Sequence, residues 1–283
     1  MNAARPIPRF AVIGHPVAHS RSPSIHAAFS AQTGIALEYG LLPCEPSQFE
    51  STVTEFFKLG GCGLNVTVPF KERAWDMAQH LSQRAKVAGA VNTLWQADGT
   101  LHGCNTDGVG LLSDLQRLGF DPNGARILLI GAGGASKGVV EPLLEAGCIR
   151  LHIVNRTPER AQALSAHMKQ ALPQHAERLS HGNLHQGAGT WDIVINATSG
   201  SLQGAVPAID GLRYAGKSLA YDMFYAAQPT AFMSQAKSEG ASATADGLGM
   251  LVGQAAESFR IWHGVTPAIA PVLDALRRAL SAA

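Results

Sequence analysis

The chain has 283 residues, which exceeds the usual size of a single domain and therefore predicts two domains. Apolar residues make up 46% and charged residues 15%, and the formal net charge is +1. This balance is typical of a globular protein and excludes a polyelectrolyte partner such as nucleic acid. We expect a small-molecule substrate as the partner of a monomer or homodimer.

The four cysteines are far apart and form no C-x-x-C pair, so neither a zinc site nor a redox motif is predicted: Cys44, Cys62, Cys104 and Cys148. We expect no metal. The first nine residues contain no apolar run after their arginines, and no segment approaches 18 uninterrupted apolar residues. These features predict a cytoplasmic protein that does not enter a membrane.

Short apolar runs alternate with helix-length segments along the whole chain, which predicts an α/β fold with parallel sheets. In the first half we predict strands at residues 10–14, 37–42, 63–66, 92–96 and 101–104. Helices are expected from Pro23 to Ser30 and over 49–59. The dipeptide Asp98-Gly99 predicts a tight turn that pairs the last two strands as a hairpin.

A helix over 107–118 and a turn-rich stretch over 119–124 precede a very apolar strand, which marks the entrance to a second α/β domain. The strands predicted there are 126–130, 151–154, 192–196 and 218–221. The closing segments, 249–262 and 272–282, are helical, and we predict that they return to the first domain.

The run Gly131-Ala-Gly133-Gly134-Ala-Ser136-Lys137 stands where a buried strand turns into a helix. Glycines there permit a tight turn and a close approach of backbone to a pyrophosphate, which the helix N-terminus attracts. Ser136 replaces the third glycine of G-x-G-x-x-G, so the motif alone is weak. The run lacks the Gly-Lys-Ser/Thr ending of a P-loop, which disfavours an ATPase.

The end of the next strand selects the cofactor, because a dinucleotide site places its discriminating residue about 20 residues after the glycine turn. The sequence there is Asn155-Arg156-Thr157-Pro158-Glu159-Arg160, with no carboxylate where an NAD enzyme would have one at the ribose. Guanidinium groups suit the 2′-phosphate of NADP. Arg156 and Arg160 are four residues apart, which predicts that both face the ribose from one helical turn.

Three polar clusters of the first half follow predicted strands, where α/β sheets bind ligands. Ser20 and Ser22 could cradle a carboxylate, although Ser22 before Pro23 is also a common helix cap. Other members of the clusters are Asn65, Thr67, Lys71, Asn92, Asn105 and Asp107. Taken alone, Lys71 is the kind of residue that is more often a solvated surface lysine, and Asp107 reads as an N-cap.

Further segments resemble one family in the family's own order. They are 65–71 (NVTVPFK), 89–93 (GAVNT), 105–108 (NTDG), 131–137 (GAGGASK), 155–157 (NRT), 196–199 (NATS), 221–225 (YDMFY) and 246–250 (DGLGM). Together with the serine cluster they make the chain similar to shikimate dehydrogenase from about Phe10 to about Pro271. The resemblance implies an α/β substrate domain over 1–107, a Rossmann-type NADP-binding domain over 108–247, and C-terminal helices over 248–283 that pack back on the substrate domain.

The resemblance also implies the residues of the site. Those for shikimate are Ser20, Ser22, Asn65, Thr67, Lys71, Asn92, Asp107, Tyr225 and Gln254. Ser20 and Ser22 would hold the carboxylate, and the amides with Asp107 would bind ring hydroxyls. Those for NADP are Gly131, Ala132, Gly133, Gly134, Ala135, Ser136, Asn155, Arg156, Thr157, Arg160, Thr198, Met223 and Gly247.

The implied activity is the NADPH-dependent reduction of 3-dehydroshikimate to shikimate, with Lys71 and Asp107 as the catalytic pair. Lys71 either donates the proton or polarises the oxygen electrostatically. One departure from the family stands at Gly200-Ser201-Leu202, where Ser-Gly-Leu is usual. The alternatives are an NAD-dependent quinate/shikimate dehydrogenase, which Arg156 argues against, and a non-catalytic NADP-binding regulator.

Overall fold

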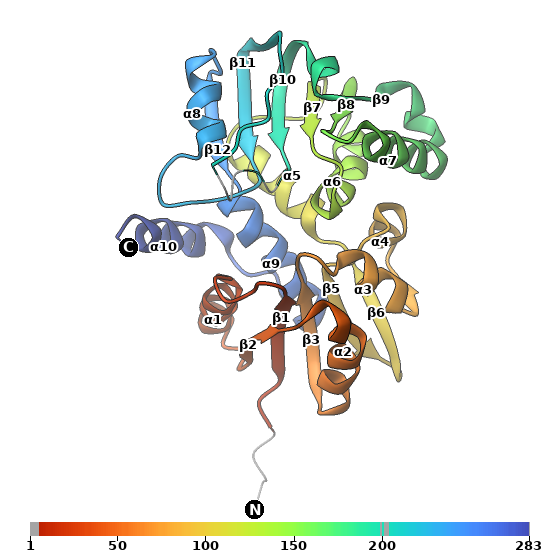
Figure 1. Cartoon of the computed structure of the whole chain (residues 1–283). Coiled ribbons are helices and arrows are strands. Elements are labelled where there is room, and N and C mark those ends of the chain that lie inside the picture. Colours follow the sequence, from red (N-terminus) through yellow and green to blue (C-terminus); the bar gives the residue numbers. More distant parts are fainter. Residues whose placement is uncertain (1–5, 199, 201–203, 283) are drawn as a thin grey trace, which may run out of the picture. The chain divides into compact units, whose positions relative to one another are not determined.

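The computed structural model describes residues 6–198, 200 and 204–282 (Figure 1). Backbone contacts divide these residues into two compact units. The first unit contains the described residues up to Thr106 together with Gln254–Val272, and the second contains Asp107–Gly253 together with the chain from Leu273 onward.

The first unit is built on a six-stranded mixed sheet in the order β2-β1-β3-β5-β6-β4. Its strands are β1 (Arg9–Gly14), β2 (Glu38–Pro43), β3 (Gly61–Val66), β4 (His80–Leu81), β5 (Thr93–Ala97) and β6 (Thr100–Cys104). β1 pairs in parallel with β2 and β3, whereas β5 is antiparallel to both β3 and β6. The predicted strands are therefore all present, and β4 is the one that the pattern missed.

The helices of this unit are α1 (Ser22–Thr33), α2 (Phe49–Lys58), α3 (Lys71–Met77) and α4 (Gln83–Ala88), with a 3-10 turn η1 (Pro46–Gln48) before α2. Ile13, Phe49, Leu64 and Phe70 are fully or almost fully buried in one apolar cluster between the sheet and these helices. The predicted β5–β6 hairpin is confirmed, because Asp98 and Gly99 both adopt positive φ, at 50° and 74°.

The second unit contains an all-parallel six-stranded sheet in the order β12-β11-β10-β7-β8-β9. Its strands are β7 (Arg126–Ile130), β8 (Arg150–Val154), β9 (Leu179–Gly182), β10 (Gly189–Asn196), β11 (Leu212–Asp222) and β12 (Ala243–Asp246). Counted from β7 as the first strand, this order is 3-2-1-4-5-6, that of a dinucleotide-binding Rossmann fold, which places its ligand where the order reverses between β7 and β10.

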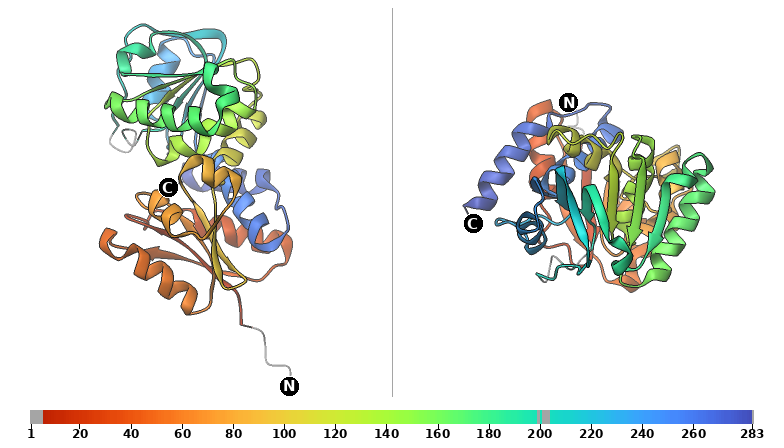
Figure 2. Two further views of the ribbon diagram at one scale, coloured as in Figure 1. Left: turned by 90° about the vertical axis from the view of Figure 1, so that its right-hand side faces the viewer. Right: turned by 90° about the horizontal axis from the view of Figure 1, so that it is seen from above.

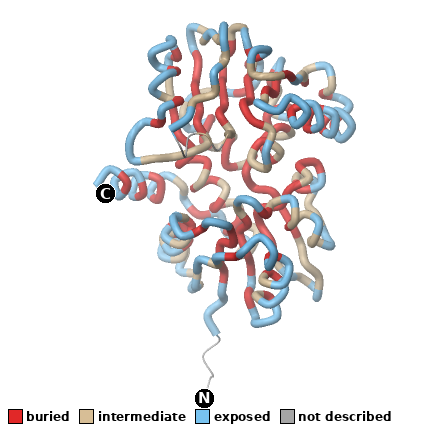
Figure 3. The backbone as a smooth tube through the Cα atoms, in the orientation of Figure 1, coloured by how far each residue is buried: buried red, intermediate tan, exposed pale blue. Residues whose placement is uncertain are grey.

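Helices cover both faces of this sheet, and Figure 2 shows α7 and α8 on opposite faces. The helices are α5 (Asp107–Arg117), α6 (Gly134–Glu145), α7 (Pro158–Ala171) and α8 (Ala231–Ser238), with 3-10 turns η2 (Pro173–Arg178) and η3 (Leu184–Gly187). The short strands β9 and β12 were not predicted, because their apolar runs are too brief to stand out. Figure 3 shows the backbone coloured by burial, and the strands β1 and β3 of the first sheet and β7 and β8 of the second are largely buried.

Two C-terminal helices close the chain, α9 (Leu248–His263) and α10 (Ile269–Ser281), close to the limits that the sequence predicts. In the described part of the chain, no helix combines the length and apolarity needed to cross a bilayer.

Candidate functional site

The polar clusters of the first unit gather at one edge of its sheet. β1 and β3 are parallel, so the loops that follow them, which carry Ser20 and Thr67, leave the sheet at the same edge. β5 is antiparallel to β3, so Asn92, which precedes β5, also lies at this edge. The register thereby assembles residues from loops that are far apart in sequence.

Ser20 and Ser22 are coupled to each other at the start of α1. The Ser20 hydroxyl donates to Ser22 Oγ over 3.2 Å, and the Ser22 backbone N–H donates to Ser20 Oγ over 3.3 Å. The N-cap of α1 is Arg21, whose side chain makes no capping bond, and Ser22 is the first helical residue. The interpretation of Ser22 as a simple helix cap is therefore wrong.

The Asn65 side chain is buried and belongs to a cluster of hydrogen-bonded side chains. Its Oδ1 accepts from the Tyr39 hydroxyl at 2.7 Å. Its Nδ2 lies 3.2 Å from the Asn92 carbonyl, 3.3 Å from Thr93 Oγ1 and 3.0 Å from Ser258 Oγ. The amide is 5% exposed, so its bonding is largely internal to the protein.

Asn92 extends the same cluster toward α9. Its Oδ1 accepts from the Thr106 backbone N–H at 2.9 Å, and its Nδ2 lies 3.0 Å from Thr106 Oγ1 and 3.4 Å from Gln254 Oε1. Ser258, one turn after Gln254 on α9, contacts the hydroxyls of both Thr93 and Thr106. Three of the predicted shikimate residues therefore belong to one connected set of neutral amides and hydroxyls, Asn65, Asn92 and Gln254, whereas Ser20 and Ser22 form a separate pair.

Thr67 and Lys71 frame the turn between β3 and α3. The Thr67 N–H donates to the Ile13 carbonyl at 3.0 Å, which ties this turn to the end of β1. Lys71 is the first residue of α3, is half-buried, and its carbonyl accepts from the Val91 N–H at 2.8 Å. The lysine is thus anchored by its backbone next to the Asn92 cluster rather than carried on a free surface helix.

Sequence reasoning missed two residues of this cluster, Tyr39 and Ser258. Thr93 and Thr106 stand in the segments 89–93 and 105–108 that the sequence pointed to, but no role was predicted for them. Each belongs to an element that looks ordinary in the sequence, and only pairing between distant elements reveals its role. It also missed His26, which is fully buried and stacks on Tyr39 with 4.1 Å between ring centroids and 6° between planes. Burial lowers the pKa of His26 to about 3, His263 adds to this shift, and Asn65 opposes it slightly.

In the second unit, the glycine turn joins β7 to α6 as predicted. Gly131 has a φ of 113°, and a side chain there would meet the backbone of Ala197 at 3.2 Å. At Gly133, the N-cap of α6, a Cβ would meet nothing within 4 Å, and no side chain caps the helix. The turn therefore leaves open space beside unpaired helical N–H groups, as an anion site requires.

Ser136 lies in the first turn of α6 and is fully buried, yet its Oγ has no hydrogen-bond partner among the described residues. A buried hydroxyl without a partner is unusual and fits a site that a polar ligand completes. Ala132 and Ala135, the other members of the predicted turn, have no polar side chain and contribute backbone alone.

The loop after β8 presents the predicted cofactor arginines. Asn155 Nδ2 donates to the Thr157 carbonyl at 2.8 Å, which shapes the loop before α7. Arg156 and Arg160 are exposed, and neither makes an ion pair within the described part of the chain. The spacing argument for these arginines is wrong, however, because α7 begins at Pro158 and Arg156 therefore precedes the helix.

Thr198, Met223 and Gly247 follow β10, β11 and β12. The Thr198 hydroxyl donates to Asn196 Oδ1 at 2.8 Å, and the Met223 N–H donates to the Asn196 carbonyl at 2.9 Å. A side chain at Gly247 would lie 2.2 Å from the Met223 carbonyl oxygen, so this close approach requires glycine. The three residues thus mark the carboxyl ends of neighbouring strands.

Buried carboxylates stabilise this unit through side-chain hydrogen bonds, a role that the sequence did not predict. Asp114 Oδ2 accepts from the Tyr221 hydroxyl at 2.8 Å and its Oδ1 from Arg117 at 2.7 Å. Asp246 accepts from Arg277 of α10 at 2.8 Å.

Two predicted shikimate residues belong to the second unit. Asp107 is the buried first residue of α5, and Tyr225, in the loop after β11, is half-buried with its ring 6.2 Å from that of Phe224.

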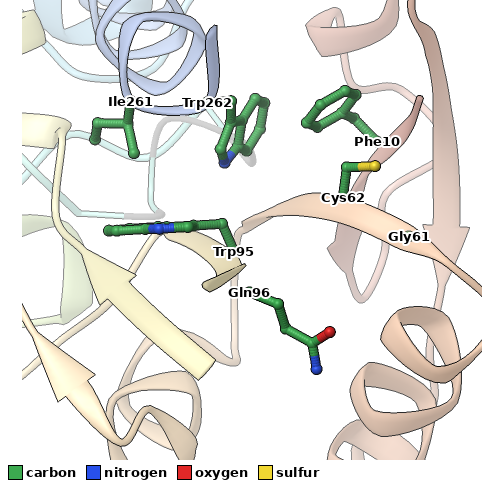
Figure 4. A pocket seen from close by; sticks show the side chains of 7 residues that line it. All are labelled: Phe10, Gly61, Cys62, Trp95, Gln96, Ile261 and Trp262. Carbon is green, nitrogen blue, oxygen red and sulfur yellow. The ribbon is translucent and has the colours of Figure 1, made fainter. Parts of the chain in front are cut away.

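A separate hollow of about 330 Å³ lies in the first unit (Figure 4). It is lined by Phe10, Gly61, Cys62, Trp95, Gln96, Ile261 and Trp262. Because β1 and β3 begin here and the antiparallel β5 ends here, the hollow lies at the sheet edge opposite the polar cluster. It is therefore distinct from the candidate site.

Family models cover most of the chain. Residues 12–94 match the shikimate dehydrogenase substrate binding domain, 115–203 match shikimate / quinate 5-dehydrogenase, and 247–277 match the shikimate 5′-dehydrogenase C-terminal domain. The chain belongs to the shikimate dehydrogenase family. The predicted family and the predicted α/β class with a Rossmann-type sheet are thereby confirmed.

Among curated relatives, shikimate dehydrogenase (NADP(+)) of Bordetella petrii is 60% identical over 285 residues, which cover 100% of this chain and 99% of its own. Among solved structures, an Ael1 enzyme from Pseudomonas putida is 39% identical with a TM-score of 0.85, covering 95% of this chain and 98% of its own. Shikimate 5-dehydrogenase from Thermus thermophilus, in complex with NADP(H) and shikimate, is 34% identical with a TM-score of 0.83, covering 97% and 100%.

The relative's name agrees with the predicted cofactor, NADP. The departure from the family pattern after Thr198 cannot be placed, because Ser199, Ser201 and Leu202 lie outside the described residues.

Proposed function

We propose that this chain is an NADP-dependent shikimate dehydrogenase that catalyses the reversible reduction of 3-dehydroshikimate to shikimate, a step of chorismate and aromatic amino acid biosynthesis. The observation that carries the proposal is 60% identity to a shikimate dehydrogenase (NADP(+)) along the whole chain. The connected neutral cluster of the first unit and the glycine turn of the second unit support it independently.

The first unit suits a polyhydroxylated acid. Alternating amide and hydroxyl groups offer both donors and acceptors, which ring hydroxyls require. We propose that Ser20 and Ser22 bind the carboxylate and that Asn92 and Gln254 bind ring hydroxyls. Asn65 uses most of its bonding capacity inside the protein, so we propose that it reaches the substrate with no more than the second lone pair of its Oδ1.

The second unit fits NADP on its own geometry. The open space at Gly133 and the unpartnered Ser136 hydroxyl suit a pyrophosphate at the N-terminus of α6. Exposed Arg156 and Arg160, without ion pairs in the described chain, suit the 2′-phosphate. We propose that Thr157, Thr198, Met223 and Gly247 complete the cofactor site at the strand ends.

Bound NADPH supplies the hydride for carbonyl reduction, and the protein must supply the proton. We propose that Lys71 gives this proton to the carbonyl oxygen and takes it back in the reverse direction. Its place at the start of α3 fixes the backbone from which the ammonium extends. We propose that Asp107 orients this ammonium and accepts a hydrogen bond from a substrate hydroxyl, and that Tyr225 lines the same substrate.

We also propose a cytoplasmic location. All four cysteines are unpaired, and three are buried, as is usual in a reducing compartment.

The test is a steady-state assay of the purified chain with shikimate or quinate and with NADP or NAD, following absorbance of the reduced cofactor. We expect shikimate with NADP to give the highest kcat/KM, by at least an order of magnitude over either alternative. Equal efficiency on both acids would contradict the substrate assignment. Absence of turnover despite NADP binding would identify the chain as a regulator.

A further inference from the structure

Two buried side chains of the second unit stand behind the strand ends of the candidate cofactor site. Asn196 and Asp222 are the last residues of β10 and β11, and they lie opposite each other in the parallel ladder between these strands. Both are 0% exposed. The Asn196 amide nitrogen donates to Asp222 Oδ1 at 3.3 Å, and Asn196 Oδ1 accepts from Thr198 in the loop after β10.

The orientation of the Asn196 amide follows from its partners. The backbone N–H of Thr198 can only donate, so the Asn196 atom that faces it at 3.2 Å is the oxygen. The Thr198 hydroxyl lies 2.8 Å from the same oxygen, and it must donate because an amide oxygen only accepts. The single hydrogen of this hydroxyl is therefore engaged, and toward a ligand the hydroxyl can only accept.

The Asp222 carboxylate holds the amide in this orientation. Its Oδ1 accepts from the Phe224 backbone N–H at 3.2 Å, so the amide end that faces Oδ1 is the nitrogen. Its Oδ2 accepts from the Thr230 hydroxyl at 2.7 Å. Thr230 caps α8, and its oxygen accepts from the Met233 N–H, which leaves the hydroxyl hydrogen for Asp222. A charged acceptor forms a stronger hydrogen bond than a neutral one, so a rotated amide is disfavoured.

Thr198 lies where the two halves of the sheet meet. The Ala197 N–H donates to the Ile130 carbonyl at 2.8 Å, and a side chain at Gly131 would lie 3.3 Å from Thr198 Cγ2. Thr198 therefore borders the glycine turn, at the reversal of strand order where a Rossmann fold binds its dinucleotide. The proposed 2′-phosphate site follows β8, so the ends of β10, β11 and β12 belong to the nicotinamide half of the cofactor.

We propose that Asn196 and Asp222 are positioning residues of the cofactor site, which fix the Thr198 hydroxyl as an acceptor for a hydrogen-bond donor on the nicotinamide half of NADP. The donors of that half are the carboxamide N–H and the ribose hydroxyls. The pyrophosphate is excluded as the partner, because its oxygens also only accept. This inference rests on the proposed function, which makes NADP the cofactor.

The first test measures binding to the full-length chain by isothermal titration calorimetry, without substrate. Thr198→Val removes the hydroxyl and keeps the shape of the side chain. We expect the Kd for NADP to rise roughly 3- to 10-fold, as for one lost hydrogen bond. The Kd for adenosine 2′,5′-bisphosphate, which lacks the nicotinamide half, should stay unchanged. Thr190→Val is the matched control and should change neither Kd, because Thr190 is a partly buried threonine at the opposite end of β10.

The 3-acetylpyridine analogue of NADP identifies the donor, because its methyl ketone replaces the carboxamide and carries no N–H. If the carboxamide is the donor, Thr198→Val should weaken NADP and leave the analogue unchanged. If a ribose hydroxyl is the donor, both should weaken equally. An unchanged Kd for NADP, or an equal loss for adenosine 2′,5′-bisphosphate, would overturn the proposal.

The second test addresses the positioning itself. Asn196→Ala removes the acceptor of the Thr198 hydroxyl, so it should weaken NADP to the same degree and again spare adenosine 2′,5′-bisphosphate. The double variant with Thr198→Val should lose little more than either single variant, because both changes remove one linkage. Additive losses would overturn the proposal. A lower Tm with an unchanged Kd for NADP would also overturn it, because Asn196 would then be a scaffold contact alone.

Should Asn196→Ala fail to fold, Asn196→Ser gives the same test with a polar side chain. The single serine oxygen cannot reach both Asp222 and Thr198, which face opposite ends of the amide. The same selective loss of NADP affinity is expected, and full wild-type affinity would overturn the proposal. These tests measure binding, so a wild-type chain that binds NADP without acting on shikimate would contradict the proposed function while the comparison of variants still decides this inference.

Discussion

The two units stabilise the ends of their strands by different chemistry. In the first unit, neutral amides and hydroxyls from β2, β3, β5 and α9 share hydrogen bonds behind the candidate shikimate site. In the second unit, buried carboxylates such as Asp114 and Asp246 accept from a tyrosine or an arginine. Amides and hydroxyls of a neutral cluster can exchange hydrogen-bond partners with the ring hydroxyls of a substrate. The ion pairs of the second unit instead stabilise its fold, and the arginines outside these pairs can bind an anionic cofactor.

The largest expected effect tests the catalytic group of the first unit. Lys71→Met should lower kcat by roughly 10² to 10⁴, the range for a removed acid/base group, and change the KM for shikimate only modestly. Lys86→Met, at an exposed lysine of α4, is the control and should be close to wild type. A raised KM with kcat near wild type would make Lys71 a binding residue.

The next prediction tests whether an exposed arginine of the second unit selects NADPH over NADH. Arg156→Asp removes a guanidinium and adds repulsion, so kcat/KM with NADPH should fall roughly 10- to 100-fold while that with NADH changes far less. Both cofactors should be measured at one ionic strength. Arg213→Asp, an exposed arginine at the start of β11, is the matched control. If both variants kept the wild-type ratio of NADPH to NADH, discrimination would lie elsewhere in the loop.

A third change tests the scaffold role of the ion pairs. Arg277→Met leaves the carboxylate of Asp246 without its arginine donor, while the backbone N–H of Leu248 still donates to it. The loss should be about 1 to 2 kcal/mol of unfolding free energy, at the lower end for a charged hydrogen bond because the Arg277 side chain is 44% exposed. Chemical denaturation measures it, and Arg278→Met is the neighbouring control. Equal stability of the two variants would show that the pair is a surface contact.

The last prediction concerns stability as a function of pH and compares a buried histidine from each unit. Burial lowers the pKa of His26 to about 3 and that of His152 to about 4. In the unfolded chain these two imidazoles bind protons below about pH 6.5, whereas in the folded chain they stay neutral down to their lowered pKa values. The free energy of unfolding is therefore highest above pH 6.5 and falls as the pH drops toward those values. At pH 5, His26 should lower the free energy of unfolding by about 2 kcal/mol, because each pH unit below its unfolded pKa costs about 1.4 kcal/mol.

His26→Phe should therefore be more stable than wild type at pH 5 and within about 1 kcal/mol of it at pH 7.5, since neither ring nitrogen makes a well-formed hydrogen bond. His152→Phe should lose about 0.5 to 1.5 kcal/mol at pH 7.5, because its Nδ1 bonds Ser180 Oγ at 2.7 Å. Urea unfolding at the two pH values measures both. If the free energies of unfolding of His26→Phe and wild type changed equally between the two pH values, His26 would not be a neutral buried histidine.

The sequence by itself determined the alternation of strands and helices, the glycine turn at 131–134 and the hairpin at Asp98-Gly99, because each depends on local periodicity or on a φ angle that few residues adopt. The family resemblance supplied the candidate ligands. The short strands β4, β9 and β12 escaped prediction, since two to four residues carry no period.

Only the tertiary structure decided which polar residues are joined. Tyr39 and Ser258 come from an edge strand and a C-terminal helix, and nothing local distinguishes them from core or surface positions. The register of β3 against β1 and β5 brings them to Asn65, because a hydrogen bond depends on distance in space and not on separation in sequence. For the same reason, the four-residue spacing of Arg156 and Arg160 gave a wrong geometry, since the helix starts only at Pro158.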